Sequence, residues 1–509
     1  MLKGTGRVFS EIGVPAAGVE AGFANGFMYT RMRPLIGADR PRTTLPPLVL
    51  LKLVTRLHPE FRRRERRAKA SLSARPAPAL AVVQQWESEI RPRLLERNRA
   101  LQAVDLDTLS DNDLEQHLGA LLDHALENFT LHFWLHGHDL GPIARYLHSA
   151  IGWGLDPVEA IDALAGASPS TSLPRESLLE LRRLVDESDH PVRSLEDLRS
   201  SSDEAAGLLD RYLADRAMVM TTGYDLTSLT LGELPDVVMR SILSAVGGKA
   251  VEADDIAAGL STKVEPAMRA EFDELLHDAR SVMDMRDDNG PMTSEWPAGL
   301  LRHGLLAAGQ RLAAQGYADE PEQVFELTEA EARSLFSGVR PSAGELASRR
   351  ERRLLNARLT PPVVLGDPEP APPDDMLPPS QAKLVAMVQT SLKFLGMDGE
   401  GTTEGMTGVG VGSESYIGRA RTAFSAEEAI DKLEDGDVLI VRATSPAFNS
   451  VLAIAGAVVT TDGGLLSHAA VLARELGIPA LVGVSGALDI EDGASVEVDP
   501  VAGTIRVLA

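Results

Sequence analysis

The sequence predicts a multidomain chain in which a large, mostly α-helical domain is followed by a small α/β domain. Apolar residues recur at helical spacing through residues 80–358, proline crowds residues 360–380, and short β-like apolar runs follow a glycine-rich stretch beyond them. A chain of 509 residues is also too long for one ordinary core. We therefore expect a helical domain over 1–360, a Pro-rich linker over 361–380 and an α/β domain over 381–509.

The clearest predicted helix is DNDLEQHLGALLDHALENFTLHFWL (111–135). Ser110 stands at its N-cap position, and nothing between 80 and 358 alternates as a strand would. Its apolar stripe recurs three and four residues apart, at Leu114, Leu118, Leu121, Leu122, Ala125 and Phe129. Further helices are predicted at 177–185, 203–220, 266–285, 297–316 and 329–338, and a short strand followed by a turn at 23–35.

The stretch from 360 to 380 contains eight prolines and is expected to be extended and semi-stiff. Beyond it we predict a helix at 381–397, a glycine-rich stretch at 399–413 and a second helix from His468 to Leu476. Short strands are predicted at 437–443, 456–461, 480–484, 495–499 and 504–508. The last two, which PVAG joins, have the pattern of a β-hairpin.

Composition and charge restrict the classes of function. The chain has no cysteine, which excludes disulfides, thiolate catalysis and Cys-based zinc sites. No apolar run approaches the roughly 20 residues of a membrane span, and no signal peptide is recognisable. We therefore expect a cytoplasmic protein that binds neither membrane nor nucleic acid.

The one basic region is near the N-terminus. The first 100 residues hold 19 Lys and Arg against 8 Asp and Glu, with a peak at FRRRERRAKA (61–70), although the whole chain has a net charge of −24. Aromatic residues make up only 4% of the chain, and none is interleaved with these arginines to stack on bases. A solvated helix face is therefore favoured over a nucleic-acid surface.

The stretch TTDGGLLSHAAVLARELGIP (460–479) carries the strongest chemical signal. A buried strand leads into a turn at Gly463 and Gly464, where glycine permits positive φ and a close approach of the backbone. Ser467 is a candidate N-cap, so His468 is predicted to be the first residue of a helix.

The positive end of a helix disfavours a charged imidazole and favours a bound dianion. A neutral nucleophile beside an anion site is what a phosphohistidine requires, and Arg474 on the same helix can balance the charge of a phosphate. A histidine at a helix start is more often a surface or capping residue, however. The residues alone therefore leave both interpretations of His468 open.

The longer stretch TTDGGLLSHAAVLARELGIPALVG resembles, without gaps, the signature of the mobile (swivelling) domain of the phosphoenolpyruvate-utilising enzymes. DGDVLIVRATSPAF (435–448) is similar to the strand and turn that precede this signature. The resemblance implies a β/β/α swivelling phosphohistidine domain over 381–509, in which His468 is the phosphorylated residue. It places the phosphate group beside Thr461, Gly463, Gly464, Ser467 and Arg474.

Three stretches of the helical region resemble the helical middle domain of rifampin-phosphotransferase-type proteins, which binds the acceptor. They are residues 223–235, 310–336 and 352–362. In such proteins an ATP-grasp domain comes first, and neither that domain nor the phosphoenolpyruvate-binding barrel of other members is recognisable here. VGGKA (246–250) lacks the upstream glycine and the following Ser or Thr of a P-loop.

We therefore expect a split system similar to phenylphosphate synthase, whose histidine and nucleotide chemistry lie on different subunits. A separate ATP-grasp protein, acting in trans and binding ATP and Mg2+, would phosphorylate His468, and this chain would bind no cofactor directly. The linker would let the histidine domain swing to a small alcohol or phenol held by the helical domain.

Six residues are candidates for the acceptor pocket. One of the histidines can act as a base toward a hydroxyl group, or they can simply solvate a helix end. No carboxylate pattern such as HExxH accompanies them, so no metal is expected. The charged pair in MRDDNG (285–290) either caps a helix or positions the acceptor or a phosphate. The candidates are His132, His136, His138, Glu233, Arg286 and Asp287.

The predicted function is a phosphotransferase, or one subunit of it, that relays a phosphoryl group through His468 to a small organic hydroxyl. Two alternatives stay open. One is a biosynthetic dehydratase on the same scaffold, which couples phosphorylation to elimination. The other is a non-catalytic binding or regulatory protein that lacks the ATP domain.

Overall fold

The computed structural model describes residues 1–37, 44–221, 224–245, 253–359, 361–362, 364–366, 370, 373–396, 406–444, 448–452 and 454–508. VGGKA (246–250), residues 399–405 of the glycine-rich stretch and several residues of the Pro-rich stretch lie outside this description. Within the described part, no helix combines the length and the apolar character needed to cross a bilayer.

The chain folds into two compact units, and each is assembled from two separate stretches. Unit 1 comprises Met1–His138 and Met292–Ala386, and unit 2 comprises Asp139–Pro291 and Met387–Ala509. These units do not follow the predicted domain boundaries at 360 and 380. Those boundaries concern parts that move independently, and they stay a prediction.

Unit 1 is mainly helical but starts with a helix and a hairpin. α1 (Leu2–Ile12) packs on the antiparallel strands β1 (Ala16–Ala24) and β2 (Phe27–Pro34). The sequence analysis predicted only one short strand from residue 23. The strands are joined by Asn25 and Gly26, both with positive φ, which is the usual chemistry of a tight hairpin turn.

The other elements of unit 1 are helical, and the basic run lies in one of them, α3. There Phe61, Arg64 and Ala68 are buried while most other residues are exposed. The elements are α2 (Leu48–Leu57), α3 (Pro59–Ser73), α4 (Ala79–Gln85), η1 (Trp86–Ile90), α5 (Arg91–Gln102), η2 (Leu106–Thr108), η4 (Pro291–Glu295), α15 (Trp296–Ala314), η5 (Pro321–Glu326), α16 (Glu329–Arg333), α17 (Ala343–Asn356) and η6 (Asp374–Met376).

The long predicted helix is confirmed as α6 (Asp111–Gly152). Ser110 Oγ accepts a hydrogen bond from the Asp113 amide at 3.2 Å, as the N-cap prediction requires. The helix runs past the predicted end at residue 135 and through Pro142, because buried residues such as Leu147 continue its apolar stripe. Residues up to 138 belong to unit 1 and the remainder to unit 2.

The helices of unit 2 that precede its sheet confirm most of the predicted helical stretches. Leu181, Leu209 and Ile242 are fully buried where α8, α10 and α11 pack together. The predicted helix at 266–285 is two helices, α13 and α14. The elements are α7 (Pro157–Asp162), α8 (Pro169–Asp186), α9 (Leu195–Ser201), α10 (Asp203–Arg216), η3 (Leu231–Glu233), α11 (Pro235–Ser244), α12 (Ala253–Lys263), α13 (Arg269–Ser281) and α14 (Met283–Gly290).

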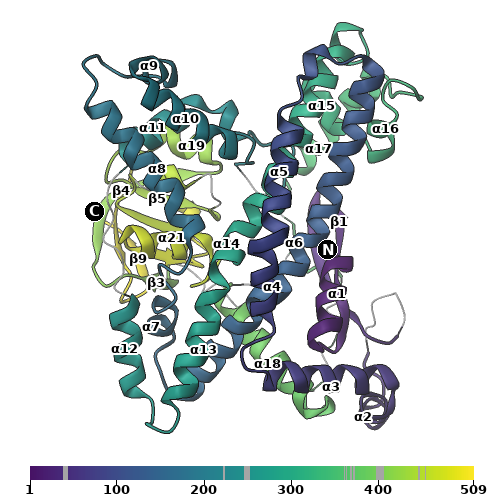
Figure 1. Ribbon diagram of the computed structural model, residues 1–509, viewed down its shortest axis with the longest axis vertical. Helices are drawn as coiled ribbons and strands as arrows, with labels where there is room; N and C mark the ends of the chain where they lie inside the picture. The colour runs from purple at the N-terminus through teal and green to yellow at the C-terminus, as the bar shows by residue number, and fades with distance from the viewer. Residues whose placement is uncertain are drawn as a thin grey trace. The chain divides into compact units, whose positions relative to one another are not determined.

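The C-terminal part of unit 2 contains a seven-stranded mixed sheet in the order β3-β7-β6-β5-β4-β8-β9, drawn in green and yellow in Figure 1. Neighbouring strands from β4 to β7 are parallel, and the others pair antiparallel. The strands are β3 (Val409–Val411), β4 (Tyr416–Ala423), β5 (Val438–Val441), β6 (Ala457–Thr460), β7 (Ala480–Val482), β8 (Ser495–Asp499) and β9 (Thr504–Val507).

All five predicted strands of this region are confirmed, and β8 and β9 form the predicted hairpin. β3 and β4 were not predicted. The accompanying helices are α18 (Pro379–Phe394), α19 (Ala426–Lys432), α20 (Asn449–Leu452), α21 (His468–Leu476) and η8 (Ala487–Asp489).

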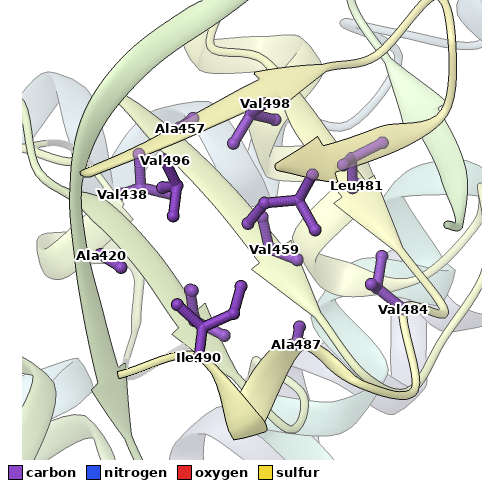
Figure 2. Packing of buried hydrophobic residues seen from close by; sticks show 12 residues of the cluster. Ala420, Val438, Ala457, Val459, Leu481, Val484, Ala487, Ile490, Val496 and Val498 are labelled. Atoms are coloured by element: carbon purple, nitrogen blue, oxygen red, sulfur yellow. The ribbon is translucent and has the colours of Figure 1, made fainter. Parts of the chain in front are cut away.

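The core of the sheet fixes the frame on which the site is built. Every residue of β5 and β6 is buried, which is typical of parallel strands covered on both faces. Figure 2 shows Val438, Val459, Leu481 and Val498 among the side chains that pack together in this core. The carboxyl ends of β5 and β6 therefore lie side by side at one edge of a rigid sheet.

Candidate functional site

The carboxyl edge of the sheet brings Thr444 and His468 together. Thr444 follows β5, and His468 follows β6 after a seven-residue turn. Since β5 and β6 are parallel neighbours, both connections leave the sheet at the same edge. The Thr444 hydroxyl lies 3.1 Å from His468 Nδ1, which leaves Nε2 as the ring nitrogen that can carry a covalent group.

The predicted ends of the histidine helix are confirmed. His468 is the first residue of α21, and Ser467 Oγ accepts a hydrogen bond from the Ala470 amide at 3.4 Å. The helix ends at Gly477, whose φ of 69° is the left-handed conformation of a C-cap glycine. The N-cap fixes where the helix starts and therefore where the imidazole stands.

The glycine turn is shaped by its packing against the end of α18. A Cβ at Gly464 would lie 2.4 Å from the Phe394 carbonyl oxygen, and the Leu466 amide donates to that same oxygen at 2.8 Å. Gly463 has a φ of 103°, which disfavours any side chain. The buried Thr461 extends the turn with its hydroxyl 3.4 Å from the Arg442 carbonyl oxygen.

The imidazole of His468 is held in its neutral form. Burial, and then the positive charge of Arg286, lower the pKa of His468 to about 4. The sequence predicted a neutral imidazole from a different cause, the positive end of the helix. A neutral imidazole keeps a lone pair on one ring nitrogen, and that nitrogen is Nε2 in the tautomer whose Nδ1–H donates to the Thr444 hydroxyl. This is the form that attacks phosphorus.

Arg474 folds back along α21 toward the turn that precedes it. Its Nη1 donates to the Leu465 carbonyl oxygen at 2.6 Å, and its Nε pairs with Asp162 of α7. Only 5% of the side chain is exposed. Arg474 therefore stabilises the turn before His468, and its predicted contact with phosphate stays a prediction.

The structure brings the predicted pair Arg286 and Asp287 to the histidine helix. Arg286 Nη2 donates to the Leu466 carbonyl oxygen at 2.8 Å, two residues before His468. Its Nη1 lies 3.6 Å from Asp287 Oδ1. Burial raises the pKa of Asp287, and the charge of Arg286 opposes that rise.

Sequence reasoning missed Glu475, which lies two turns after His468 on α21. Its carboxylate accepts a hydrogen bond from Thr171 Oγ1 at 2.9 Å. A small cavity of about 20 Å³ adjoins it, bounded by the α7–α8 connection, α14 and α21, and its lining includes Ser168, Asp287 and Glu475. In the sequence, the only sign of a role for Glu475 was its place in the signature that contains His468. The residues that Glu475 meets belong to α8 and α14, which are distant in the chain.

The three predicted pocket histidines lie in the other compact unit. His132, His136 and His138 belong to unit 1, whereas His468 belongs to unit 2. His132 Nδ1 lies 3.1 Å from Thr293 Oγ1, and His138 Nε2 lies 3.0 Å from Glu11 Oε2. Their role as a base therefore stays a prediction.

Glu233 lies in η3, where its carboxylate accepts hydrogen bonds from the amide and hydroxyl of Thr230 at 2.8 and 3.0 Å. This is a capping box, which accounts for the residue structurally. Among the described residues, no group of three or more histidines and carboxylates is arranged to hold a metal ion.

Comparison with known proteins places this geometry in a family. The family described as PEP-utilising enzyme, mobile domain, matches residues 433–503, which run from the end of α19 to the turn before β9 and include His468. Residues 433–503 thus resemble the mobile domain of the PEP-utilising enzymes. The expected resemblance is thereby confirmed, and the histidine helix α21 lies within the matched residues.

Several named relatives match different shares of the chain. Rifampicin phosphotransferase of Bacillus cereus is 42% identical over 21% of this chain and 12% of its own length. Phosphoenolpyruvate synthase of Aeropyrum pernix is 45% identical over 17% of this chain and 11% of its own length. Chondramide synthase cmdD of Chondromyces crocatus is 27% identical over 100% of this chain and 13% of its own length. The chain thus spans less than a fifth of each of these relatives.

Proposed function

We propose that this chain is a phosphotransferase component whose mobile domain carries a phosphoryl group on His468 Nε2. The single observation that carries the proposal is the fixed imidazole: its Nδ1 is held by Thr444 at 3.1 Å, and its pKa is lowered to about 4. Such a histidine is neutral, oriented and nucleophilic at neutral pH. The family match over residues 433–503 supports the same chemistry.

Arg286 supplies positive charge where a phosphoryl group would need it. Its guanidinium acts on His468 electrostatically and is anchored by the Leu466 carbonyl oxygen at 2.8 Å. A cation at this place stabilises the charge of a phosphoryl group as it enters and leaves. In this proposal Arg286 acts on the phosphoryl group through its charge, and its Nη1 lies 3.6 Å from Asp287 Oδ1.

The donor in this proposal is a separate ATP-grasp protein. It would bind ATP and Mg2+ and transfer the β-phosphoryl group to His468. The γ-phosphoryl group would pass to water, so that AMP and phosphate are released. The N–P bond on Nε2 would then break as the phosphoryl group passes to a small alcohol or phenol, whose proton ends on the imidazole. No residue of this chain is assigned to nucleotide binding.

A biosynthetic dehydratase is the second candidate. The whole chain matches a protein named a synthase at 27% identity, which fits a biosynthetic role for the scaffold. In that case phosphorylation of a hydroxyl would be followed by loss of phosphate, and a phosphorylated product would not accumulate. A stable phosphorylated product favours the phosphotransferase.

The proposal is tested by labelling. The purified chain is mixed with β- or γ-labelled ATP, alone and with an ATP-grasp protein encoded near it, and acid-labile label is sought. We expect label only with the ATP-grasp protein, and none on the His468→Ala variant. His303→Ala serves as the matched control, because it removes an imidazole from a helix of the other unit.

Two outcomes of the labelling experiment would contradict the proposal. Label on the chain without a partner would mean that the chain binds nucleotide itself and would overturn the split arrangement. Absence of label with an ATP-grasp protein of proven activity would overturn the phosphohistidine mechanism. The non-catalytic binding protein would then be the better description.

A further inference from the structure

Two carboxyl groups face one cavity at the contact between α14 and α21. Asp287 of α14 and Glu475 of α21 both line it, and the charge of Asp287 raises the pKa of Glu475. Thr171 Oγ1 donates to Glu475 Oε1 at 2.9 Å, whereas Asp287 Oδ2 is buried without a hydrogen-bond partner among the described residues. The phosphotransfer scheme above uses neither carboxyl group for chemistry.

The surroundings of the pair do not neutralise two negative charges. Arg474 on α21 is already paired with Asp162 of α7, and Arg286 lies 3.6 Å from Asp287 Oδ1. Further carboxylates add to the negative charge. The charged groups that act on the pair are Arg286 and Asp284 of α14, Asp139 of α6 and Arg175 of α8.

Burial, like this repulsion, disfavours the ionised form of both carboxyl groups. Burial raises the pKa of Glu475 to about 7 and also raises the pKa of Asp287. The cavity of about 20 Å³ has room for little more than one water molecule, so solvent cannot screen the two groups. Two carboxylates in such a site cannot both ionise without cost, and the contact therefore binds protons.

The same carboxyl groups would behave differently if α21 left its neighbours. Water would then reach both, and their pKa values would return to about 4, the ordinary value for Asp and Glu. The packed arrangement thus holds protons that the separated arrangement releases at neutral pH. A difference in bound protons makes an equilibrium depend on pH.

We propose that Asp287 and Glu475 form a proton-dependent latch that holds α21, and with it His468, against α8 and α14. Because the packed state binds protons more tightly, packing is fully favoured below the ordinary carboxyl range and weakens as pH rises through neutrality. For one linked proton, the ratio of packed to separated molecules falls by up to about tenfold for each pH unit.

The latch goes beyond the proposed function, and only its link to transfer depends on that function. A phosphoryl dianion on His468 would compete with Asp287 for the charge of Arg286. Asp287 would then hold its proton more tightly, so phosphorylation at fixed pH would be accompanied by proton uptake in the packed state. The histidine would be released for movement most readily when these protons are lost.

The test measures packing directly, without nucleotide or transfer. The chain has no cysteine, so cysteines introduced at Arg240 of α11 and Asp431 of α19 can carry two spin labels. These residues form an exposed contact within unit 2 at 3.2 Å, away from the cavity. Pulsed electron resonance then gives the distribution of label distances at about pH 5.5 and about pH 8.5.

We expect one short distance at the lower pH and an added population of longer distances at the higher pH. Glu475→Gln in the labelled chain should keep the short distance at both, because the amide has the same shape and cannot ionise. Asp287→Asn should also keep the short distance at both pH values. This second variant keeps the test decisive if Glu475→Gln does not fold. Glu491→Gln removes an exposed carboxyl group of the same unit. In this variant the label distances should change with pH as they do in the parent.

Two results would overturn the latch. One is a parent whose distance distribution does not change between the two pH values. The other is a well-folded Glu475→Gln and Asp287→Asn pair that responds to pH as strongly as the parent. Neither result depends on whether His468 is phosphorylated, so failure of the latch and failure of the proposed function remain distinguishable.

Discussion

At the scale of single residues, the site depends on one imidazole whose orientation and charge have separate causes. Thr444 fixes the ring by contact with Nδ1, while burial and Arg286 keep it neutral. The sequence predicted His468 because it stands in an uninterrupted signature at a helix start. It gave no role to Thr444, which is 24 residues earlier in the chain and reaches the ring only because β5 and β6 are adjacent.

Thr444→Val removes the hydroxyl and keeps the shape of the side chain. We expect the rate of His468 labelling to fall about tenfold, because one hydrogen bond of about 1.4 kcal/mol no longer orients the ring. The rate is measured with labelled ATP and the ATP-grasp protein. Thr444→Ser keeps the hydroxyl and should retain most of the rate. Wild-type labelling of the valine variant would show that Thr444 does not position the imidazole.

At the scale of elements, a glycine is required where the backbone of the turn before α21 packs directly on the backbone of α18. The turn between β6 and α21 packs on the end of α18, which leaves no space for a Cβ at Gly464. The sequence predicted this turn but not its neighbour, because the contact joins residues that are 70 positions apart in the chain.

Gly464→Ala tests this packing. Its Cβ would lie 2.4 Å from the Phe394 carbonyl oxygen, so the backbone must move. We expect the free energy of unfolding to fall by about 1–3 kcal/mol, as measured by urea unfolding. Gly259→Ala in α12 is the control, because nothing lies within 4 Å of its Cβ. It should leave stability unchanged or raise it by up to about 1 kcal/mol. Equal effects of the two substitutions would contradict this account.

One of the two strands that sequence patterns missed, β4, has a physical explanation. β4 carries Gly418 and two arginines, Arg419 and Arg421, in the middle of an internal strand. Both arginines place Nε 3.0 Å from the carboxylate of the buried Asp437. These ion pairs let polar residues occupy a strand between β5 and β8, which an apolar pattern cannot reveal.

At the scale of the whole molecule, each compact unit is closed by contacts between distant stretches of chain. In unit 2 the buried pair Arg474–Asp162 joins residues 312 positions apart. Its guanidinium is 5% exposed and its carboxylate 28%. A charge buried to this extent depends on its partner much more than an exposed one does.

Asp162→Asn leaves the buried guanidinium without its carboxylate. We expect the free energy of unfolding to fall by about 3–5 kcal/mol. Asp186→Asn makes the same change in the Arg182–Asp186 pair of α8, whose side chains are 36% and 58% exposed, and should cost less than about 1 kcal/mol. Urea unfolding of the three proteins measures the difference. Similar losses in both variants would show that burial does not decide the strength of the first pair.

The sequence by itself determined the long helix α6 and several other helices, the five apolar strands and the position of His468 at the start of a capped helix. These follow from local patterns of apolar residues, glycine and caps, which act over a few neighbouring positions. Tertiary structure alone decided that Thr444 and Arg286 lie against the start of that helix and that Glu475 shares a cavity with Asp287. It also decided that the predicted histidines of α6 belong to the other unit. Such groupings arise from strand order and from packing between distant stretches, which no local pattern encodes.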